Sequence, residues 1–340
     1  MKNENSILVT GGAGFIGKHL VKKLMSNSQD LGLGSLTIVD NLSGQDDVGS
    51  RKNKETIVPS HRNLHFYKED IRNEKAISNI IKDGEIDTCI HLAALTNVAS
   101  SIKNPNKTMD INVIGTLKLL ESCALNGVKN FIFASSAAAY GKATRLPIRE
   151  SLVLQPISPY GASKVAGEAL VTSFKNMDRI QNAVSLRMFN VYGYNQNPDY
   201  ADVITVFARR LNRGLPPVIN GDGKQTRDFI SVSDAADCMI LALKVLEQRK
   251  GQPLSTSSRL PYHVFNVGTG ISTSINELAT KMLEIYGFDL KPIHTNETVP
   301  GEIRYSYADT KLANSYLHFR AKQTLESGLE EIINHPFHRD

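Results

Sequence analysis

The chain has 340 residues, of which 41% are hydrophobic and 21% are charged, and its formal net charge is +5. This length can bury a full α/β core, and it favours one large domain with a smaller second lobe over two independent domains. The mild charge argues against a nucleic-acid-binding protein, because no basic face with interleaved aromatic residues accompanies it. Arg51, Lys52 and Lys54 are interpreted as a solvated loop.

The sequence shows no sign of a membrane anchor, a signal peptide or a metal site. No apolar stretch is long enough to cross a bilayer, and the first ten residues lack the hydrophobic region of a signal peptide. Cys89, Cys123 and Cys238 stand in apolar surroundings, so we interpret them as reduced core thiols. His61 and His65 form only a loose pair without a carboxylate partner. We therefore expect a cytoplasmic protein with no membrane partner, no nucleic-acid partner and no metal.

Glycines at regular spacing follow the first apolar run. Residues 7–10 predict a buried strand, and a helical pattern to about residue 25 follows the glycines. Gly11 allows a sharp turn, and Gly14 removes the side chain that would hold a pyrophosphate off the backbone. Gly17 lets the helix pack closely on the strand, while the helix N-terminus presents free N–H groups to an anion. The stretch therefore predicts a dinucleotide-binding turn.

Residues at the ends of the next strands extend this prediction. A second apolar run at 36–39 ends in Asp40 and Asn41, where a carboxylate can accept hydrogen bonds from both ribose hydroxyls. Because an acid at this point repels a 2′-phosphate, we expect NAD rather than NADP. Asp70 and Ile71 follow an expected strand at 65–68, beside the expected adenine position.

Strands and helices alternate through the first half of the chain. We expect further strands at 88–92 and 131–134, and helices at 75–81 and 106–125. That alternation predicts an α/β fold of the Rossmann type, a doubly wound parallel sheet with helices on both faces. Ala93 and Ala94 follow the fourth strand and are small enough to let the backbone lie along a dinucleotide.

The second half predicts a smaller α+β lobe interleaved with the first domain. A long helix begins at Ser158, a strand covers 183–189 and a helix covers about 203–212. Residues 221–223 give a hairpin signal, residues 229–247 indicate a return to the main sheet, and 251–258 indicate a connector. We therefore expect an NAD-binding domain over 1–188 plus about 225–250. The substrate-binding lobe would comprise 189–224 and 251–340.

Three side chains could carry out proton transfer. Tyr160 and Lys164 are four residues apart on one predicted helix and so share a face, and Ser136 ends the fifth strand, at the edge where open parallel sheets bind ligands. A nearby ammonium and a positive nicotinamide ring would both favour the phenolate of Tyr160. Tyr160 could then accept a proton from a substrate hydroxyl while Ser136 holds the same oxygen.

The chain resembles the extended short-chain dehydrogenases/reductases of the nucleotide-sugar epimerase/dehydratase group, and within it the UDP-hexose 4-epimerases. The resemblance covers nearly the whole length. It rests on TGGAGFIG at 10–17, VDNLS at 39–43, EDIR at 69–72, HLAAL at 91–95, FIFASSAAAYG at 131–141, SPYGASK at 158–164, LRMFNVYG at 186–193, GDGKQTRDFISVSD at 221–234 and PGEIRYSYAD at 300–309.

The resemblance implies a role for each residue that matches a motif. Ser136, Tyr160 and Lys164 would be catalytic. NAD would be bound by Gly11, Gly14, Phe15, Ile16, Gly17, Asp40, Asn41, Ser43, Gly44, Asp70, Ile71, Leu92, Ala93, Ala94, Tyr160 and Lys164. The UDP-sugar would be bound by Asn190, Val203, Arg227 and Glu302, with Arg304 as a weaker candidate. The helices at 106–125 and 158–176 resemble the pair that forms a homodimer in this group.

Three reactions of this group are weighed against the residues before Tyr140. Dehydratases carry an Asp-Glu pair where this chain has Ala137 and Ala138, so 4,6-dehydration would lack its acid catalyst. Decarboxylases of UDP-uronates usually carry a Glu at the Ala138 position, yet a 4-keto uronate loses carbon dioxide with little help, so a decarboxylase giving a UDP-pentose is the alternative. A 4-epimerase that works through a transient 4-keto sugar needs only the residues present.

The choice of sugar depends on two local departures from the resemblance. Members restricted to glucose and galactose carry a bulky tyrosine where this chain has Ser306. The smaller serine would leave room for an N-acetyl group on the sugar. Tyr194 and Asn195 replace a common Pro-Arg pair, so recognition of the C6 end of the sugar stays open. The candidates are UDP-GlcNAc/UDP-GalNAc, UDP-Glc/UDP-Gal and the corresponding uronates. A catalytically silent NAD-binding protein would be expected to lack Tyr160 or Lys164.

Overall fold

The computed structural model describes residues 4–43, 62–196, 202–248, 263–296 and 303–334. Gly44, Glu302, the basic loop that begins at Arg51, and the expected connector at 251–258 lie outside the described residues.

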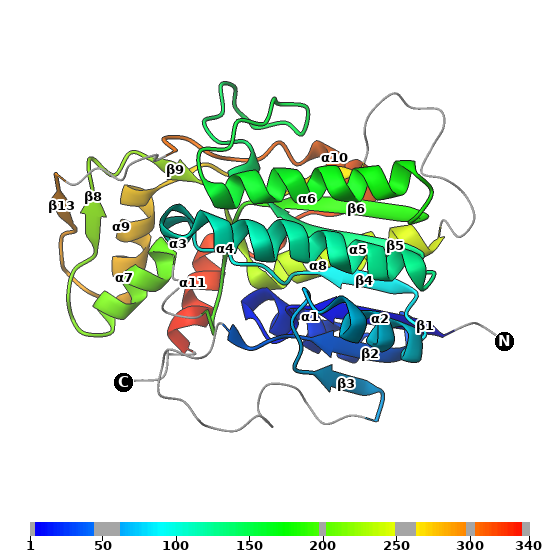
Figure 1. Ribbon diagram of the computed structural model, residues 1–340. Helices are drawn as coiled ribbons and strands as arrows, with labels where there is room; N and C mark the ends of the chain where they lie inside the picture. Colours follow the sequence, from blue (N-terminus) through cyan, green and yellow to red (C-terminus); the bar gives the residue numbers. More distant parts are fainter. Residues whose placement is uncertain (1–3, 44–61, 197–201, 249–262, 297–302, 335–340) are drawn as a thin grey trace.

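A parallel sheet of seven strands forms the larger part of the molecule (Figure 1). Its order is β11-β6-β5-β4-β1-β2-β3, and every neighbouring pair is parallel. The strands are β1 (Asn5–Thr10), β2 (Leu33–Val39), β3 (Leu64–Tyr67), β4 (Thr88–His91), β5 (Asn130–Ser136), β6 (Asn182–Met188) and β11 (Val264–Val267). The chain order reverses between β1 and β4, so the carboxyl ends of these strands form the crevice in which such sheets bind ligands. The expected Rossmann-type α/β fold is confirmed.

Helices cover both faces of this sheet because successive residues of each strand point to opposite sides. Ile7 and Val9 join one buried cluster, whereas Leu8 between them joins the other. The first face carries α1 (Phe15–Ser26), α8 (Val232–Gln248) and α10 (Lys311–Leu317), and the second carries α2 (Glu74–Asp83), α5 (Gly115–Leu125) and α6 (Pro159–Asn176). Figure 1 shows α5 and α6 crossing the front of the sheet, with the lobe to their left.

The helix expected at 106–125 is interrupted. It comprises α4 (Pro105–Met109), a π-helical turn over Asp110–Ile114 and α5, and a short α3 (Val98–Lys103) precedes it. The widened turn directs Asn112 toward Leu95, with which it exchanges two hydrogen bonds of 2.8 and 2.9 Å. Such turns occur mostly where a helix adjusts to a functional site.

The smaller lobe has a hydrophobic core of its own. Its helices are α7 (Val203–Leu211), α9 (Ile275–Tyr286) and α11 (Leu325–Asn334), and all three contribute to one buried cluster that includes Tyr192 and Phe229. Its strand pairs are β7 (Asn190–Tyr192) with β10 (Phe229–Ser231), β8 (Val218–Asn220) with β13 (Ile293–Thr295), and β9 (Thr226–Arg227) with β12 (Thr273–Ser274).

Two expectations for this half are wrong. Gly221 and Gly223 do form a turn, with positive φ angles of 72° and 68°, but β8 pairs in parallel with β13 instead of forming a hairpin. Residues 229–231 pair with β7 and not with the main sheet, whose seventh strand is β11, although the helical part of the expected return, α8, does pack on that sheet. The strand β11 falls within the range 251–340 that we assigned to the lobe, and α10 packs beside it. The proposed domain division therefore needs these two elements moved to the sheet domain.

Candidate active site

The turn after β1 brings two segments of backbone so close that only glycine fits. Gly11 has a φ of 71°, and a Cβ there would lie 2.6 Å from the backbone nitrogen of Ala93. A Cβ on Gly17 would collide with the carbonyl oxygen of Gly11, and one on Gly14 would lie 3.1 Å from the same oxygen. The first turn of α1 therefore opens directly onto the end of β4, leaving a cradle for a pyrophosphate.

Two acids at the ends of β2 and β3 are held in place by hydrogen bonds within the chain. Asp40 accepts hydrogen bonds from the backbone N–H groups of Ala13 (3.0 Å) and Leu42 (2.8 Å), and burial raises the pKa of its carboxyl group. Asp70 is paired with the Arg72 guanidinium, which lowers its pKa to about 2. The side chain of Asn41 donates to Asp70 over 3.1 Å. Asp40 therefore stands directly beside the glycine turn, where a ribose of a dinucleotide would lie.

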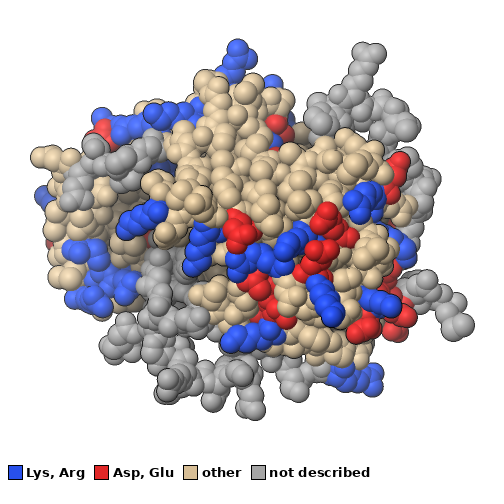
Figure 2. Space-filling model, viewed as in Figure 1, with Lys and Arg blue, Asp and Glu red and all other residues tan. Residues whose placement is uncertain are grey.

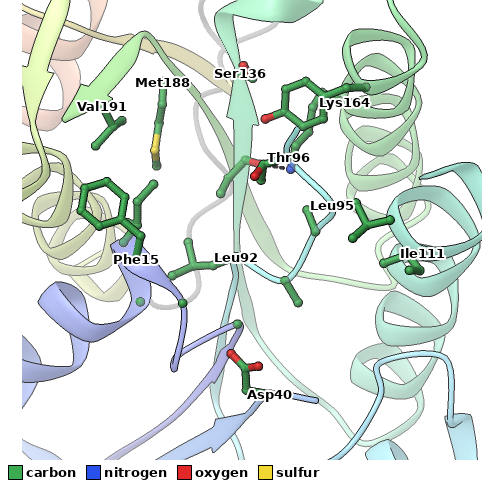
Figure 3. A pocket seen from close by; sticks show the side chains of 18 of the residues that line it. Phe15, Asp40, Leu92, Leu95, Thr96, Ile111, Ser136, Lys164, Met188 and Val191 are labelled. Carbon is green, nitrogen blue, oxygen red and sulfur yellow. Dashed lines mark hydrogen bonds between the residues drawn. The ribbon is translucent and has the colours of Figure 1, made fainter. Parts of the chain in front are cut away.

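The three candidate catalytic residues come together at the carboxyl end of β5. Ser136 ends that strand, and Ser158 caps α6 by accepting a hydrogen bond from the N–H of Gly161 (3.1 Å), with Pro159 in the first turn. The cap fixes the first turns of the helix, so Tyr160 and Lys164 face the sheet, 9% and 4% exposed. Figure 3 shows Ser136 and Lys164 at one end of the cavity and Asp40 at the other.

The charge environment of this trio differs from expectation in one respect. Lys164 Nζ donates to the carbonyl oxygen of Ala134 over 2.8 Å and lies 5.8 Å from the centre of the Tyr160 ring. Burial lowers the pKa of Lys164 to about 8, although the charge of Glu168 opposes the shift. Burial also raises the pKa of the Tyr160 phenol, and the hydrogen bond with Ser136 offsets only part of that rise. The lowered phenol pKa that we expected from Lys164 is thus absent in the protein by itself.

A buried ion pair supports these residues from behind. Glu168 accepts hydrogen bonds from Arg187 Nε (2.8 Å) and from a terminal guanidinium nitrogen (2.6 Å), and Ser135 donates to the same carboxylate over 2.5 Å. Glu168 is four residues after Lys164 on α6, whereas Arg187 is on β6. The pair therefore ties the helix that carries Tyr160 to the two strands beneath it. The four-residue spacing was the only sequence signal for this role of Glu168.

One cavity of about 440 Å³ contains both the cradle and the catalytic trio. It is lined by every expected cofactor residue that the structure describes: Gly11, Gly14, Phe15, Ile16, Gly17, Asp40, Asn41, Ser43, Asp70, Ile71, Leu92, Ala93, Ala94, Tyr160 and Lys164. Ser136 and Asn190 line it as well. This site fits a bound dinucleotide. The glycines let the backbone approach closely, the Asp40 carboxylate is held beside them, and the cavity is continuous.

The cavity also has lining residues that the sequence analysis missed. Leu95 is the last residue of the quoted HLAAL motif but was given no role, and Thr96 directly follows that motif. Gln196 and Asp202 come from the lobe and carried no sequence signal.

The remaining expected substrate residues lie outside the lining of this cavity. Val203 is the first residue of α7, directly after Asp202. Arg227 donates to the carbonyl oxygen of Ile303 over 2.6 Å, the backbone N–H of Ser306 donates to Thr226 over 3.2 Å, and Arg304 is ion-paired with Asp222 at 2.6 Å. Arg227, Arg304 and Ser306 are therefore neighbours in the lobe although nearly 80 residues separate them in sequence. Glu302 and Gly44 lie outside the described residues.

A phenol and a lysine facing a dinucleotide cradle are the arrangement by which short-chain dehydrogenases/reductases move a hydride and a proton together. This is the class that the fold and the site define. The chain belongs to the NAD dependent epimerase/dehydratase family, whose sequence model matches residues 7–268. It is accordingly an NAD-dependent enzyme of that superfamily.

Full-length relatives extend the likeness beyond the matched segment. A UDP-N-acetylglucosamine 4-epimerase from Methanobrevibacter ruminantium M1, solved in complex with UDP-N-acetylmuramic acid, is 34% identical with a TM-score of 0.82, and 98% of each chain is covered. A UDP-glucose 4-epimerase from Thermotoga maritima, solved with UDP-glucose, is 35% identical with a TM-score of 0.82, and 97% of each chain is covered. The UDP-glucose 4-epimerase of Mycolicibacterium smegmatis is 31% identical over 96% of both chains.

Two further properties concern the described residues alone. Within residues 4–43, 62–196, 202–248, 263–296 and 303–334, no group of three or more His, Cys, Asp or Glu side chains could hold a metal ion. In the same part of the chain, no helix has the length and apolar character needed to span a membrane.

Proposed function

We propose that this protein is an NAD-dependent UDP-hexose 4-epimerase that works through a transient 4-keto sugar. The observation that carries the proposal is that Tyr160 and Ser136 share one cavity with the dinucleotide cradle, while the positions directly after Ser136 are Ala137 and Ala138. With NAD as the hydride acceptor, a base and a hydroxyl donor suffice for oxidation and reduction at one carbon, whereas expulsion of a hydroxyl needs an acid beside it. The similarity to 4-epimerases over nearly the full length supports the same reaction.

The chain supplies the proton chemistry of this reaction. Bound NAD provides a hydride acceptor that becomes the donor for the return step. Tyr160 takes the proton from the 4-hydroxyl of the sugar, and Ser136 holds the same oxygen by a hydrogen bond. Lys164 adds a positive charge 5.8 Å from the centre of the Tyr160 ring. Because burial raises the pKa of Tyr160 in the protein alone, formation of the phenolate needs a further positive charge nearby, which the oxidised nicotinamide of bound NAD would supply. After the 4-keto sugar has rotated to present its other face, Tyr160 returns the proton to the sugar oxygen.

The substrate contacts are proposed from the lobe. Asn190 lines the cavity, Val203 begins the helix beside it, and Arg227, Glu302 and Arg304 are proposed to hold the diphosphate and nucleoside. A guanidinium such as that of Arg227 suits a diphosphate because its planar fork can donate two hydrogen bonds. Ser306 is 7% exposed, and its small side chain supports acceptance of an N-acetyl group. UDP-GlcNAc/UDP-GalNAc and UDP-Glc/UDP-Gal are the proposed substrate pairs, with the uronates as a further candidate.

A homodimer is the assembly that the outer face of α6 supports. Ala162, Val165, Ala166, Ala169 and Ser173 are wholly or partly exposed on that helix, and none is charged. Figure 2 shows few charged side chains around α6, whereas charges gather over α5 and α2 below it. Small side chains allow two helices to approach closely, as in a four-helix interface.

The three cysteines support a reducing compartment, and we propose the cytoplasm as the location. Cys89, Cys123 and Cys238 are free and buried. Burial raises the pKa of the Cys238 thiol, which keeps it in the unreactive protonated form.

The test is incubation of the purified protein, without added NAD, with UDP-GlcNAc, UDP-glucose and their uronates, followed by NMR. We expect inversion at C4 with every carbon retained and with activity supported by cofactor that copurifies. Release of carbon dioxide and a UDP-pentose would assign the protein to the decarboxylases instead. A 4-keto-6-deoxy product would assign it to the dehydratases.

A further inference from the structure

Among the described residues, the lobe places one charged side chain in the cavity, and one oxygen of its carboxylate has no hydrogen-bond partner there. Asp202 precedes α7 and lines the same cavity as Ser136 and Tyr160. Its Oδ1 atom accepts a hydrogen bond from the backbone N–H of Thr205 over 3.0 Å, which caps the helix. Its Oδ2 atom is shielded from solvent and has no hydrogen-bond partner among the described residues.

Helix capping accounts for one oxygen of this carboxylate but not for the other. A buried oxygen without a donor costs free energy, so such atoms are rare in folded proteins unless a ligand or water completes them. Burial raises the pKa of Asp202 to about 6, so the group still carries its charge at neutral pH. Because Asp202 lines the ligand cavity, its charge acts on any ligand group bound beside it.

The other charged groups of the cavity are accounted for at its nucleotide end or beside the phenol. Asp40, Glu69 and Asp70 follow β2 and β3, and Lys164 is bound to the carbonyl oxygen of Ala134. Among the described residues that the lobe contributes to the cavity, Asp202 is the charged one, and its neighbours there, Asn190 and Gln196, are neutral amides. Gln196 is fixed to the same turn because its side-chain oxygen accepts from Thr205 Oγ1 over 2.8 Å. The described substrate end of the cavity is therefore negative.

We propose that Asp202 is a specificity-determining residue, whose carboxylate favours hydroxyl or amide N–H groups of the sugar beside it and excludes UDP-sugars that carry a carboxylate. This inference rests on the proposed function and narrows it to neutral and N-acetylated hexoses. A uronate would place a second negative charge near a buried one without supplying a donor, and like charges brought together in a desolvated site repel strongly.

The experiment compares the full-length wild type with Asp202→Asn and Asp178→Asn. Asparagine caps helices as well as aspartate does, so Asp202→Asn keeps the helix start while removing the charge. Asp178 is exposed beyond the far end of α6 and has a φ of 54°, a conformation that asparagine tolerates, so Asp178→Asn is a matched loss of one charge away from the cavity. Each protein is assayed with UDP-glucose, UDP-GlcNAc and UDP-glucuronate, by kcat/KM for C4 inversion and by calorimetric Kd.

We expect the wild type to prefer the neutral sugars, and Asp202→Asn to raise the ratio of uronate to neutral-sugar kcat/KM, and of the corresponding affinities, by about tenfold or more. Asp178→Asn should leave both ratios at the wild-type value. An unchanged ratio in Asp202→Asn, or a wild type that prefers UDP-glucuronate, would overturn the proposal for Asp202. Absence of C4 inversion with every sugar would instead overturn the proposed function, and the Kd ratios would still decide the role of Asp202.

Discussion

The two ends of the cavity are built in different ways. At the nucleotide end the recognition groups are already paired within the chain: Ala13 and Leu42 hold Asp40, and Arg72 holds Asp70. At the lobe end, one oxygen of Asp202 has no hydrogen-bond partner among the described residues, and Arg304 forms an exposed ion pair with Asp222, away from the cavity lining.

This difference follows from the elements that carry the residues. Strand ends of a parallel sheet fix the backbone of Gly11, Asp40 and Asp70 through ladders of hydrogen bonds, so the nucleotide end exists before a ligand binds. The lobe end depends on a helix start and on strands of two or three residues, and under the proposed function its side chains would take the substrate as their partner. The preformed nucleotide end suits a cofactor that remains bound through each cycle. The lobe end suits a sugar that must rotate during the reaction.

The largest expected effect separates chemistry from cofactor binding. Tyr160→Phe removes the proton acceptor but keeps the ring that packs in the cavity, so we expect kcat to fall by roughly a thousandfold or more. The nucleotide end should be unaffected, so NAD should copurify at the wild-type ratio. Steady-state NMR assays measure kcat, and the absorbance of the released cofactor measures the amount of bound NAD. Tyr286→Phe, which removes a buried lobe hydroxyl without a described partner, is the control and should be near normal. Near-normal turnover in Tyr160→Phe would reject this base.

The next effect breaks the nucleotide end itself. Gly11→Ala places a Cβ against the backbone of Ala93 in a left-handed conformation, so we expect the free energy of unfolding to fall by about 2 to 4 kcal/mol and NAD to be lost. Gly214→Ala is the matched control, because Gly214 has a φ of 70° with open space around it. It should cost only about 1 kcal/mol and retain NAD. Equal losses in the two variants in urea titrations would mean that the contact with Ala93 is unimportant.

Lys164 lies where the two ends of the cavity meet, and we expect the burial of its charge to lower the stability of the folded protein. Its pKa falls from 10.5 to about 8 on folding, so the unfolded chain binds more protons between these values and stability rises with pH across that window. In NAD-free protein at pH 7, Lys164→Met should therefore increase the free energy of unfolding by about 1 to 3 kcal/mol while reducing activity.

The pH dependence is the sharper test of Lys164. The difference between Lys164→Met and wild type should be largest below pH 8 and should vanish toward pH 10.5, as followed by urea titrations at each pH. Replacement of the exposed Lys82 by Met gives the baseline for losing a surface lysine. A difference that stays constant from pH 7 to pH 10.5 would show that the charge of Lys164 is not what destabilises the folded state.

The sequence predicted the nucleotide end far better than the lobe, for a physical reason. Gly11 and Asp40 follow a buried strand with a clear apolar run and Ser136 ends one, and the ends of parallel strands must meet at one edge. The pairing of β10 with β7 and of β8 with β13 joins short segments that have no periodicity of their own, so no local pattern could reveal it. The direction of the Tyr160 pKa shift was missed because burial, a property of the whole fold, raises this pKa more than the hydrogen bond with Ser136 lowers it.

The smallest expected effect tests whether the lobe end rearranges. The guanidinium of Arg304 donates two hydrogen bonds to Asp222 in an exposed pair, and such pairs contribute little to stability because water screens them. Arg304→Ala should therefore leave the melting temperature unchanged within the resolution of a thermal melt. If Arg304 leaves Asp222 to reach the diphosphate, KM for the UDP-sugar should rise several-fold with kcat nearly constant, because a contact made equally in ground and transition states affects binding alone. Arg320→Ala, which removes another exposed guanidinium, should change neither quantity. An unaltered KM in Arg304→Ala would leave Arg304 with a surface role and would assign the diphosphate to Arg227 and the helix start at Val203.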